Sequence, residues 1–158
     1  MTRVNGPRSN AGIGRELIGI SASTTAQTIA NNTVTKVTFS TVDHQIGSIN
    51  PAASELVVVL PGVYLITGGL IWDTAAGAGR RQTFAETYTG ADPGVGAGNR
   101  ISTSEAYAGT VYGGQVVTKT LLLVAGSHVR LCAFQTTGAN LNIANVFGPA
   151  YLTAVKVG

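Results

Sequence analysis

The fold is decided by one stretch, residues 56–66, which runs Leu-Val-Val-Val-Leu-Pro-Gly-Val-Tyr-Leu-Ile. The chain repeats its pattern at 121–134, with the letters Leu-Leu-Leu-Val-Ala-Gly-Ser-His-Val-Arg-Leu-Cys-Ala-Phe. Each copy is an apolar run, a tight glycine turn and a second apolar run, which is typical of two strands joined by a turn. Proline followed by glycine at 61–62 favours a type II turn and a hairpin. These long apolar stretches are then strands, and the sequence predicts an all-β scaffold.

The rest of the chain continues the strand pattern. Residues 34–39 and 80–88 alternate with a period of two, and Asn31-Asn32-Thr33 is typical of a turn between strands. No stretch longer than about ten residues has helical periodicity with caps. Eight to ten short strands with turn signals between them indicate a sandwich, a barrel or a jelly roll. The further strands expected are 16–20 (or an extended tether), 27–29, 99–104, 115–124, 128–135, 141–143 and 150–157, and the expected loops are 40–54, 73–79 and 89–98.

The amino-acid composition also supports an all-β fold, and it indicates what kind of surroundings suit the protein. Only 11% of the 158 residues are charged, against about 25% in an ordinary soluble domain. Twenty threonines and 21 glycines take their place, and threonine favours strands as glycine favours turns. A surface with so few charges suits a protein that packs among neighbours.

The net charge of +3 is concentrated at the N-terminus. Residues 1–24 contain three basic residues, Arg3, Arg8 and Arg15, and one acidic residue, Glu16. The remaining chain has seven basic and six acidic residues. We therefore expect two parts, an N-terminal docking arm at 1–24 and a single jelly-roll domain at 25–158. Three spaced arginines in an arm do not form the clustered basic face that nucleic-acid binding needs, so no nucleic-acid partner is expected.

Several strands are apolar on both faces, which bears on assembly. Residues 56–60 and 63–68 begin apolar on either side, and in 128–134 Val129, Leu131 and Ala133 alternate with Arg130, Cys132 and Phe134. A strand of a two-sheet sandwich needs only one apolar face. The second face is expected to meet another subunit. A monomer with a few exposed apolar residues is the alternative.

The strand and turn residues resemble a known superfamily. The order is Gly62-Val63-Tyr64-Leu65-Ile66, Trp72, Arg80-Arg81, Ala125-Gly126-Ser127-His128-Val129-Arg130-Leu131, Gln135-Thr136-Thr137-Gly138 and Tyr151-Leu152-Thr153-Ala154-Val155. This order resembles the complement component 1q globular-head and tumour-necrosis-factor-like (TNF-like) jelly rolls, in the form found in small virion proteins of tailed bacteriophages. Ser127 stands where that family usually has an acidic residue. The resemblance spans about 25–158 and implies an antiparallel jelly-roll sandwich that forms a homotrimer around a three-fold axis.

Catalytic and cofactor chemistry finds little support in the sequence. His44 and His128 are the only histidines, no Gly-x-Ser-x-Gly elbow is present, and the acids are scattered singly. The sequence has no clustered ligand set for zinc or calcium. Two pairs that could come together in loops, Asp43 with Asn50 and Asp73 with Asp92, are left open as alternatives. The lone Cys132 fits a buried, inert thiol. We expect no enzyme, no cofactor and no metal site, and neither a signal peptide nor membrane insertion is expected.

The leading hypothesis is therefore a non-enzymatic virion protein made in the host cytoplasm and carried on the particle surface. A trimeric knob of the capsid-decoration or head-fibre type would contact capsid or tail protein through Arg3, Arg8 and Arg15. The alternative is a tail-tip or fibre-head module for host adhesion, in which the loops bind a host surface glycan. The candidate residues for such loops are His44, Asp73, Tyr88, Asp92 and Asn99. An enzyme is kept as a third class. For the adjacent pair Arg80-Arg81, binding of an anionic glycan is one alternative; because neighbours on a strand face opposite ways, we expect instead that one arginine points to solvent and the other pairs at an interface.

Overall fold

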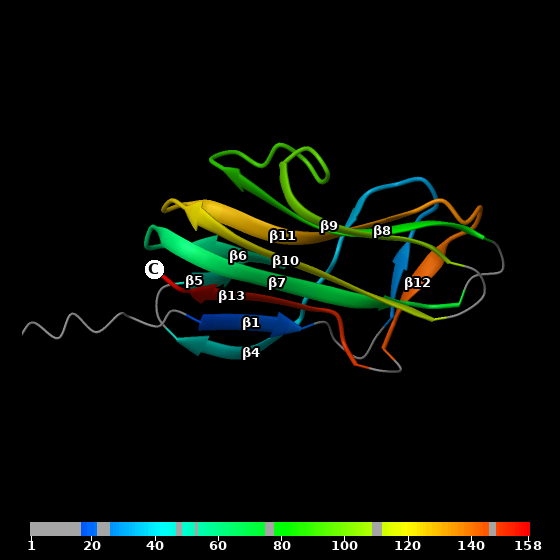
Figure 1. Cartoon of the computed structure of the whole chain (residues 1–158), viewed down its shortest axis with the longest axis horizontal. Coiled ribbons are helices and arrows are strands. Elements are labelled where there is room, and N and C mark those ends of the chain that lie inside the picture. Colours follow the sequence, from blue (N-terminus) through cyan, green and yellow to red (C-terminus); the bar gives the residue numbers. More distant parts are fainter. Residues whose placement is uncertain are drawn as a thin grey trace, which may run out of the picture.

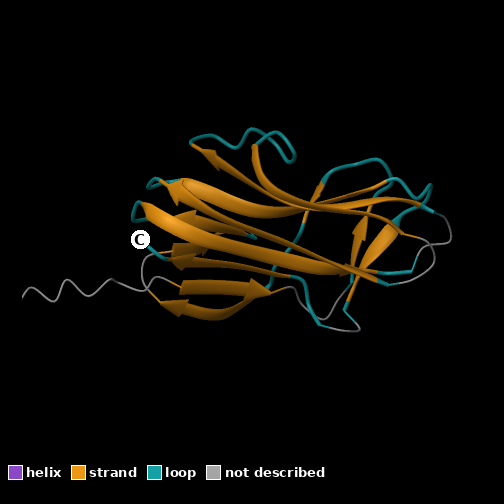
Figure 2. Ribbon diagram, in the orientation of Figure 1, coloured by secondary structure: helices purple, strands orange, loops and turns teal. Residues whose placement is uncertain are grey.

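A computed structural model describes most of the chain after residue 16. Its described residues are 17–21, 26–46, 49–52, 54–74, 78–108, 112–145 and 148–158. They form thirteen strands, and none of them is helical (Figure 2). The all-β prediction is confirmed. The expected docking residues Arg3, Arg8 and Arg15 lie outside the described residues.

The strands form two antiparallel sheets packed as a sandwich (Figure 1). In the seven-stranded sheet A the order is β2-β12-β7-β13-β1-β4, and β10 pairs with the other side of β7. Its strands are β1 (Leu17–Ser21), β2 (Gln27–Ile29), β4 (Thr41–Ile46), β7 (Gly62–Trp72), β10 (Gly113–Leu123), β12 (Leu141–Ala144) and β13 (Tyr151–Lys156).

The six-stranded sheet B has the order β5-β6-β11-β8-β9, with β3 pairing with β11 beside β6. Its strands are β3 (Thr35–Lys36), β5 (Ile49–Ala52), β6 (Glu55–Val58), β8 (Gly79–Thr89), β9 (Asn99–Ala108) and β11 (Ser127–Gln135). The strands expected at 80–88, 99–104, 115–124 and 128–135 are therefore present.

The core lies between the sheets and is filled by alternate residues of each strand. Sheet A contributes Tyr64, Ile66 and Trp72, and sheet B contributes Leu56 and Leu131, all at most 1% exposed. Burying each large side chain contributes roughly 1.5–3 kcal/mol. Such a core stabilises a chain of this length without a disulfide bond.

The two glycine turns of the repeated pattern connect the sheets, so the hairpin predicted at 61–62 is wrong. β6 lies in sheet B and β7 in sheet A, and likewise β10 lies in sheet A and β11 in sheet B. The two corners lie side by side, since the Gly126 amide donates to the Val58 carbonyl at 2.8 Å. The apolar runs therefore pair with the other copy of the pattern, β7 with β10 and β6 with β11. At 61–62 the type II turn is also wrong, because Gly62 has no positive φ and already belongs to β7.

The first described strand belongs to the sandwich although residues 1–24 were expected to form the arm. β1 lies between β13 and β4, and its Ile18 and Ile20 are 0% and 2% exposed. Their alternation with Gly19 turns both isoleucines into the core. The domain therefore includes residues 17–21.

The segment 40–54, expected as a loop, contains two strands. β4 pairs with β1 and β5 pairs with β6, so both extend an existing sheet at its edge. The turn expected at Asn31-Asn32-Thr33 is present, with Asn32 in the left-handed region at φ 58°. It too passes from one sheet to the other, because β2 is in sheet A and β3 in sheet B.

Candidate functional site

Each sheet has an outer face away from the core, and the two outer faces differ in chemistry. On sheet A the outward positions of β7, β10 and β13 alternate with buried ones. They are Val63, Leu65, Thr67, Gly69 and Ile71; Gly114, Val116, Thr118, Thr120 and Leu122; and Tyr151, Thr153 and Val155. None of these residues is charged. We call this surface the apolar face.

The apolar face is uncovered in a single chain. Leu122 lies opposite Val63 in the β10–β7 register, and Val116 lies opposite Gly69. Leu122 is 71% exposed and Val116 is 56% exposed. The two-sided apolarity that the sequence predicts for 63–68 is therefore real, and its second side, together with that of the partner strand β10, faces solvent.

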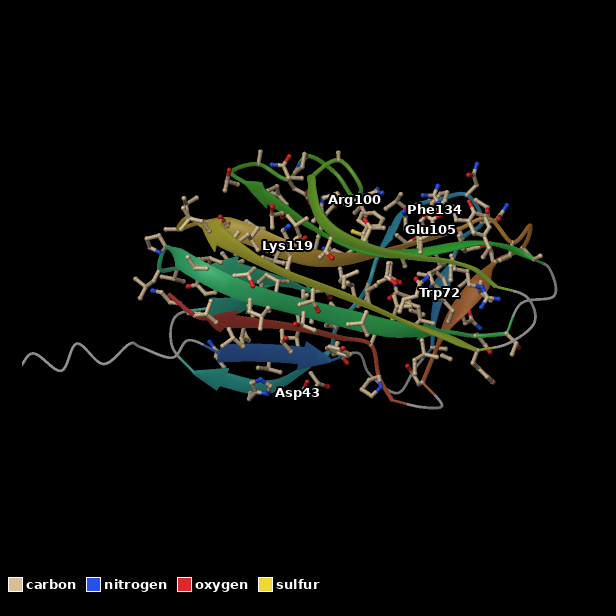
Figure 3. All side chains as sticks on the ribbon, in the orientation of Figure 1. Asp43, Trp72, Arg100, Glu105, Lys119 and Phe134 are labelled. Carbon is tan, nitrogen blue, oxygen red and sulfur yellow. The ribbon has the colours of Figure 1, made fainter. Side chains whose placement is uncertain are left out.

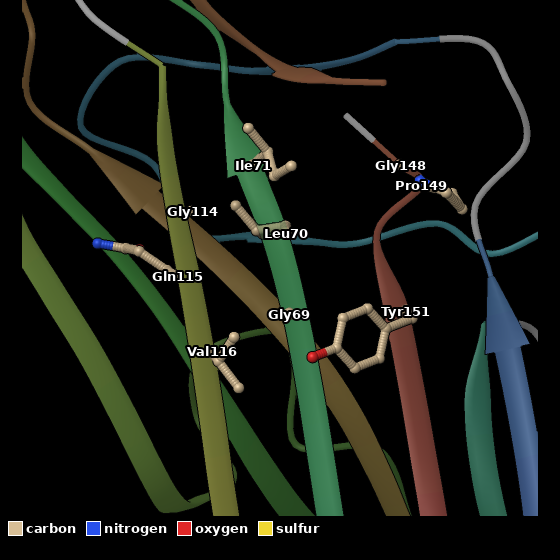
Figure 4. Close-up of a pocket in the computed structure, with 9 residues that line it drawn as sticks. All are labelled: Gly69, Leu70, Ile71, Gly114, Gln115, Val116, Gly148, Pro149 and Tyr151. Atoms are coloured by element: carbon tan, nitrogen blue, oxygen red, sulfur yellow. The ribbon is translucent and has the colours of Figure 1, made fainter. Parts of the chain in front are cut away.

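A hollow of about 420 Å³ lies in the apolar face (Figure 4). It exists because Gly69 and Gly114 have no side chains, and Ile71, Val116 and Pro149 lie around it. The ring of Tyr151 reaches over Gly69, so that a Cβ added there would lie 2.8 Å from the ring. A Cβ added at Gly114 would meet nothing within 4 Å. The hollow therefore has room for a side chain from outside.

Around Arg130 the outer face of sheet B is closed by the chain itself. Arg130 of β11 is fully buried and donates to Glu86 of β8, to Asp92 at 2.8 Å and to the carbonyl of Gly94. The Gly96 amide donates to Glu86 at 2.9 Å. These bonds hold loop 90–98 over the face. The hydrogen bonds to Asp92 and Glu86 raise the pKa of Arg130 against the lowering effect of burial.

A second carboxylate beside this cluster gathers the remaining charges. Glu55 of β6 accepts from the Tyr88 hydroxyl at 2.6 Å and from the Lys36 ammonium at 3.2 Å. The His128 ring nitrogen Nδ1 lies 3.0 Å from it, and the His128 ring stacks on Tyr88 with centroids 4.5 Å apart. Burial by itself raises the pKa of Glu55, but these hydrogen bonds outweigh it and the pKa is lowered.

This cluster corrects one expectation about assembly. The second face of 128–134 was expected to meet another subunit, yet Arg130 and Cys132 are both 0% exposed within one chain. Loop 90–98 and the buried carboxylate of Glu86 cover them. Burial raises the pKa of the Cys132 thiol, with the Glu86 charge adding to the effect, which fits the inert thiol expected from the sequence.

Aromatic rings on this face are covered by arginines. The guanidinium of Arg100 lies 3.7 Å from the Phe84 ring centroid, that of Arg130 lies 4.7 Å from Tyr88, and that of Arg80 lies 5.7 Å from Phe134. Figure 3 shows Arg100, Phe134 and Glu105 in one region of the molecule. Cation–π contacts of this kind are worth about 0.5–2 kcal/mol each.

The adjacent arginines of β8 face opposite ways, as expected. Arg80 is on the outer face and bonds Glu105 at 2.8 Å, whereas Arg81 is buried between the sheets. Burial lowers the pKa of Arg81, and the charge of Asp73 counteracts part of that effect.

The structure brings together only some of the expected ligand-loop residues. Tyr88 and Asp92 both contact Arg130, and Asn99 is exposed where β9 begins, opposite Thr87. Tyr88 and Asn99 lie on strands rather than in loops. Loop 73–79 falls partly outside the described residues, at 75–77.

The other two candidates lie elsewhere. Asp73 follows β7, where its amide donates to the Asn142 carbonyl at 2.9 Å. His44 is on the exposed strand β4 over Gly19, whose added Cβ would meet the His44 ring at 2.5 Å. The five residues therefore do not form one site.

Sequence reasoning missed the residues that organise the closed face, namely Lys36, Glu55, Glu86 and Arg130. A usable signal exists in hindsight: Glu86 is the one acidic residue of β8, and Arg130 is the one arginine of β11, in a chain with few charges. A charge in such a strand needs a partner when it is buried. The cross-strand register then pairs these two residues directly.

No cluster of three metal-ligating side chains occurs among the residues that the structure describes. In the same part of the chain, no helix is long and apolar enough to cross a membrane.

Comparison with known proteins is informative for the fold only. No protein-family model matches the chain, and no curated protein matches it. Three crystal structures of murine APRIL, at pH 5.0, 8.0 and 8.5, have TM-scores of 0.68, 0.67 and 0.62. Each is 12% identical and covers 90% of this chain and 99% of the APRIL chain. At this identity the likeness concerns the fold, and it agrees with the resemblance that the strand and turn residues carry. The chain has the TNF-like jelly-roll fold.

Proposed function

We propose that this chain is a non-enzymatic structural protein of a bacteriophage particle. Three copies form a TNF-like knob that decorates the capsid, and the N-terminal segment with Arg3, Arg8 and Arg15 attaches the knob to acidic surface on the particle. The resemblance to small virion proteins supports the particle setting. The apolar face supports the assembly.

The apolar face is the observation that carries the proposal. Its outward residues expose leucine, valine and tyrosine without a single charge, and covering such surface contributes roughly 25 cal/mol per Å². Contiguous apolar patches on soluble proteins mark interaction sites. A second copy that fills the hollow at Gly69 and Gly114 with part of its own surface makes a head-to-tail contact. Such contacts close into a ring when the rotation between copies allows it.

The two histidines support the non-enzymatic part. His128 is engaged by Glu55 and stacked on Tyr88, so it has a packing role on sheet B. His44 is on β4, in the other sheet.

The test is the mass of the chain in solution with and without charge on the apolar face. We expect the full chain to scatter light as three times 16.1 kDa at micromolar concentration. Leu122→Lys with Val116→Lys should reduce the mass to one chain, because each ammonium would have to be buried without a partner. Thr136→Lys, at an exposed position following β11, is the control and should leave the mass unchanged. A wild-type monomer contradicts the trimer.

A host-adhesion role is the second candidate. The residues expected to carry it in loops do not converge, so the loops do not favour it. An exposed aromatic ring on sheet B favours the adhesion role instead. It belongs to Tyr107 of β9, which at 80% is the most exposed of the large hydrophobic side chains described.

A further inference from the structure

The outer face of sheet B has one ring that stands apart from the others. Phe84, Tyr88 and Phe134 each have an arginine over the ring. Tyr107 is on the same face, since it lies opposite Arg80 in the β8–β9 register. Among the described residues the structure records no guanidinium over its ring, and Tyr107 is 80% exposed. Its ring is therefore presented to solvent beside a charged pair.

The residues around Tyr107 form a small ordered group, which we call the Tyr107 platform: Tyr107, Glu105, Arg80 and Gln82. Tyr107 and Glu105 are two apart on β9 and so share a face. Arg80 lies opposite Tyr107, and Gln82 opposite Glu105. Arg80 donates to Glu105 at 2.8 Å and Gln82 donates to it at 3.1 Å. The side chains of Arg80, Glu105 and Gln82 are therefore held in place beside the exposed Tyr107 ring before any ligand arrives.

The platform still offers hydrogen-bonding groups to a ligand. Both recorded bonds to Glu105 fall on its Oε2 atom, which leaves Oε1 as the oxygen available to an incoming hydroxyl. The side chains of Arg80 and Glu105 are 37% and 31% exposed. A charged hydrogen-bond acceptor and a guanidinium donor thus lie next to an open aromatic ring.

The charge balance selects the class of ligand. An anion near Tyr107 is attracted by the Arg80 guanidinium but repelled by the Glu105 carboxylate. A cation is attracted by Glu105 but repelled by Arg80. A neutral ring with several hydroxyls avoids both penalties. It stacks its C–H face on the tyrosine ring and exchanges hydrogen bonds with the carboxylate and the guanidinium. We propose that the Tyr107 platform binds a neutral saccharide.

This inference rests on the host-adhesion candidate for its biological role, but not for its chemistry. Tyr107 is on sheet B, so the platform and the apolar face belong to different sheets. The binding of sugar and the assembly of subunits are therefore measured separately.

The experiment uses the full chain and named probes. Isothermal titration with neutral methyl hexopyranosides of the gluco, galacto and manno series, and with a neutral mannan, should detect binding to the wild type. Tyr107→Ala should weaken it roughly tenfold or more, and Tyr107→Phe should keep it, because the ring and not the hydroxyl provides the stacking. Tyr112→Ala is the matched control, since Tyr112 is also exposed, at 42%, and lies outside the platform; it should bind as the wild type does.

Three results would overturn the inference. One is the absence of binding to every neutral probe. Another is preference for a sialylated or sulfated glycan, or for tetramethylammonium. The third is a fall in the solution mass of Tyr107→Ala, which would make Tyr107 an interface residue.

Adsorption to host cells separates the site from its role. Saccharide binding without competition against particle adsorption leaves the platform standing and removes the adhesion role. If the chain competes with particle adsorption but binds no neutral saccharide, the adhesion role stands and the saccharide site at the platform is ruled out.

Discussion

Arg130 is the residue on which the outer face of sheet B depends. It lies within a strand whose neighbours Val129 and Leu131 are in the core, and it is itself fully buried. Glu86 and Asp92 neutralise its charge, and loop 90–98 brings Asp92 within reach. One arginine therefore decides both the order of the loop and the burial of the Glu86 carboxylate.

Removing this arginine should be costly. Arg130→Met leaves Glu86 as a buried charge without its partner, which typically destabilises a protein by about 3–5 kcal/mol. Arg80→Met removes a partly exposed ion pair on the same sheet, worth about 0–1 kcal/mol, and a cation–π contact with Phe134, worth about 0.5–1 kcal/mol at an exposed site. Urea unfolding of both variants measures the difference. Equal losses would contradict the role given to Arg130.

The carboxylates of the closed face also predict a loss of stability in acid. Hydrogen bonds from Arg130 and the Gly94 amide lower the pKa of Asp92, and the pKa of Glu55 is lowered as well. A carboxyl group with a lower pKa in the folded state stabilises the protein above its unfolded pKa. That contribution is lost as the pH falls through the folded value.

We expect the urea midpoint to fall as the pH drops below about 4, the ordinary range of these groups. The double variant Glu55→Gln with Asp92→Asn should have a flatter profile there, although its stability at pH 7 is lower. Asn99→Ala, an uncharged change near the same loop, should keep the wild-type profile. An unchanged slope in the double variant would place the acid response elsewhere.

The residues of the closed face show how far sequence can locate a site. Tyr88 and Asp92 were selectable as polar residues near a glycine-rich loop. Their common partner Arg130 could not be identified from the sequence. It is over forty positions from Glu86, which also binds it, and only the pairing of β11 with β8 brings Arg130 to these residues. The sequence could show which single residues carry polar groups. It could not show which of them meet, because that depends on how the strands pair in the sheet.

At the scale of elements, the two corners fix how the sheets meet. Each corner takes an apolar strand from one sheet to the other, and the bond from Gly126 to Val58 joins the corners. Because β7 pairs with β10 and β6 with β11, the two copies of the pattern hold one another in register. A change in either corner should therefore affect both sheets.

Gly126 gives a sharp test of the corner. Its φ is +80°, and a Cβ there would meet no atom within 4 Å, so Gly126→Ala adds backbone strain without a clash. We expect a loss of about 1–2 kcal/mol in the free energy of unfolding. Gly113→Ala is the control, because Gly113 has no positive φ and the nearest atom to its Cβ is 3.8 Å away. A neutral Gly126→Ala would mean that the corner relaxes.

Strand positions were largely predictable, but strand partners were not. Alternation and glycine turns located β7, β8, β10 and β11 well, since a period of two depends only on which face each residue presents. The same turn residues serve a hairpin or a corner between sheets. Only the pairing of distant strands distinguishes the two, and so the hairpin predicted at 61–62 was wrong. β4 and β5 were missed because short edge strands owe their order to neighbours rather than to their own pattern.

At the scale of the whole molecule, the sandwich has one closed face and one open face. Loop 90–98 covers the part of sheet B around Arg130 with the chain's own charges, whereas sheet A exposes valine, leucine and threonine. The sequence predicted surplus apolar surface, and the structure assigns it to sheet A. This asymmetry is what a particle-borne trimer would use.

The N-terminal segment can be tested apart from the sandwich. Deleting residues 1–15 leaves β1 complete, since it begins at Leu17. We expect a folded trimer that no longer cosediments with phage particles. Replacing Arg3, Arg8 and Arg15 by glutamine in the full-length chain should weaken cosedimentation in the same direction. A truncated chain that still coats particles would contradict the proposed attachment.

The pairing of the first and last strands has a practical consequence. Leu17 lies opposite Val155, and Gly158 is tied to Val63 by a 2.7 Å hydrogen bond, so β1 begins at the same end of the sandwich as the C-terminus (Figure 1). A cargo fused after Gly158 would emerge beside the proposed anchor and be crowded against the particle. A displayed epitope belongs at the opposite end, in the connection between β11 and β12 around the exposed Gly138, where it would point into the medium.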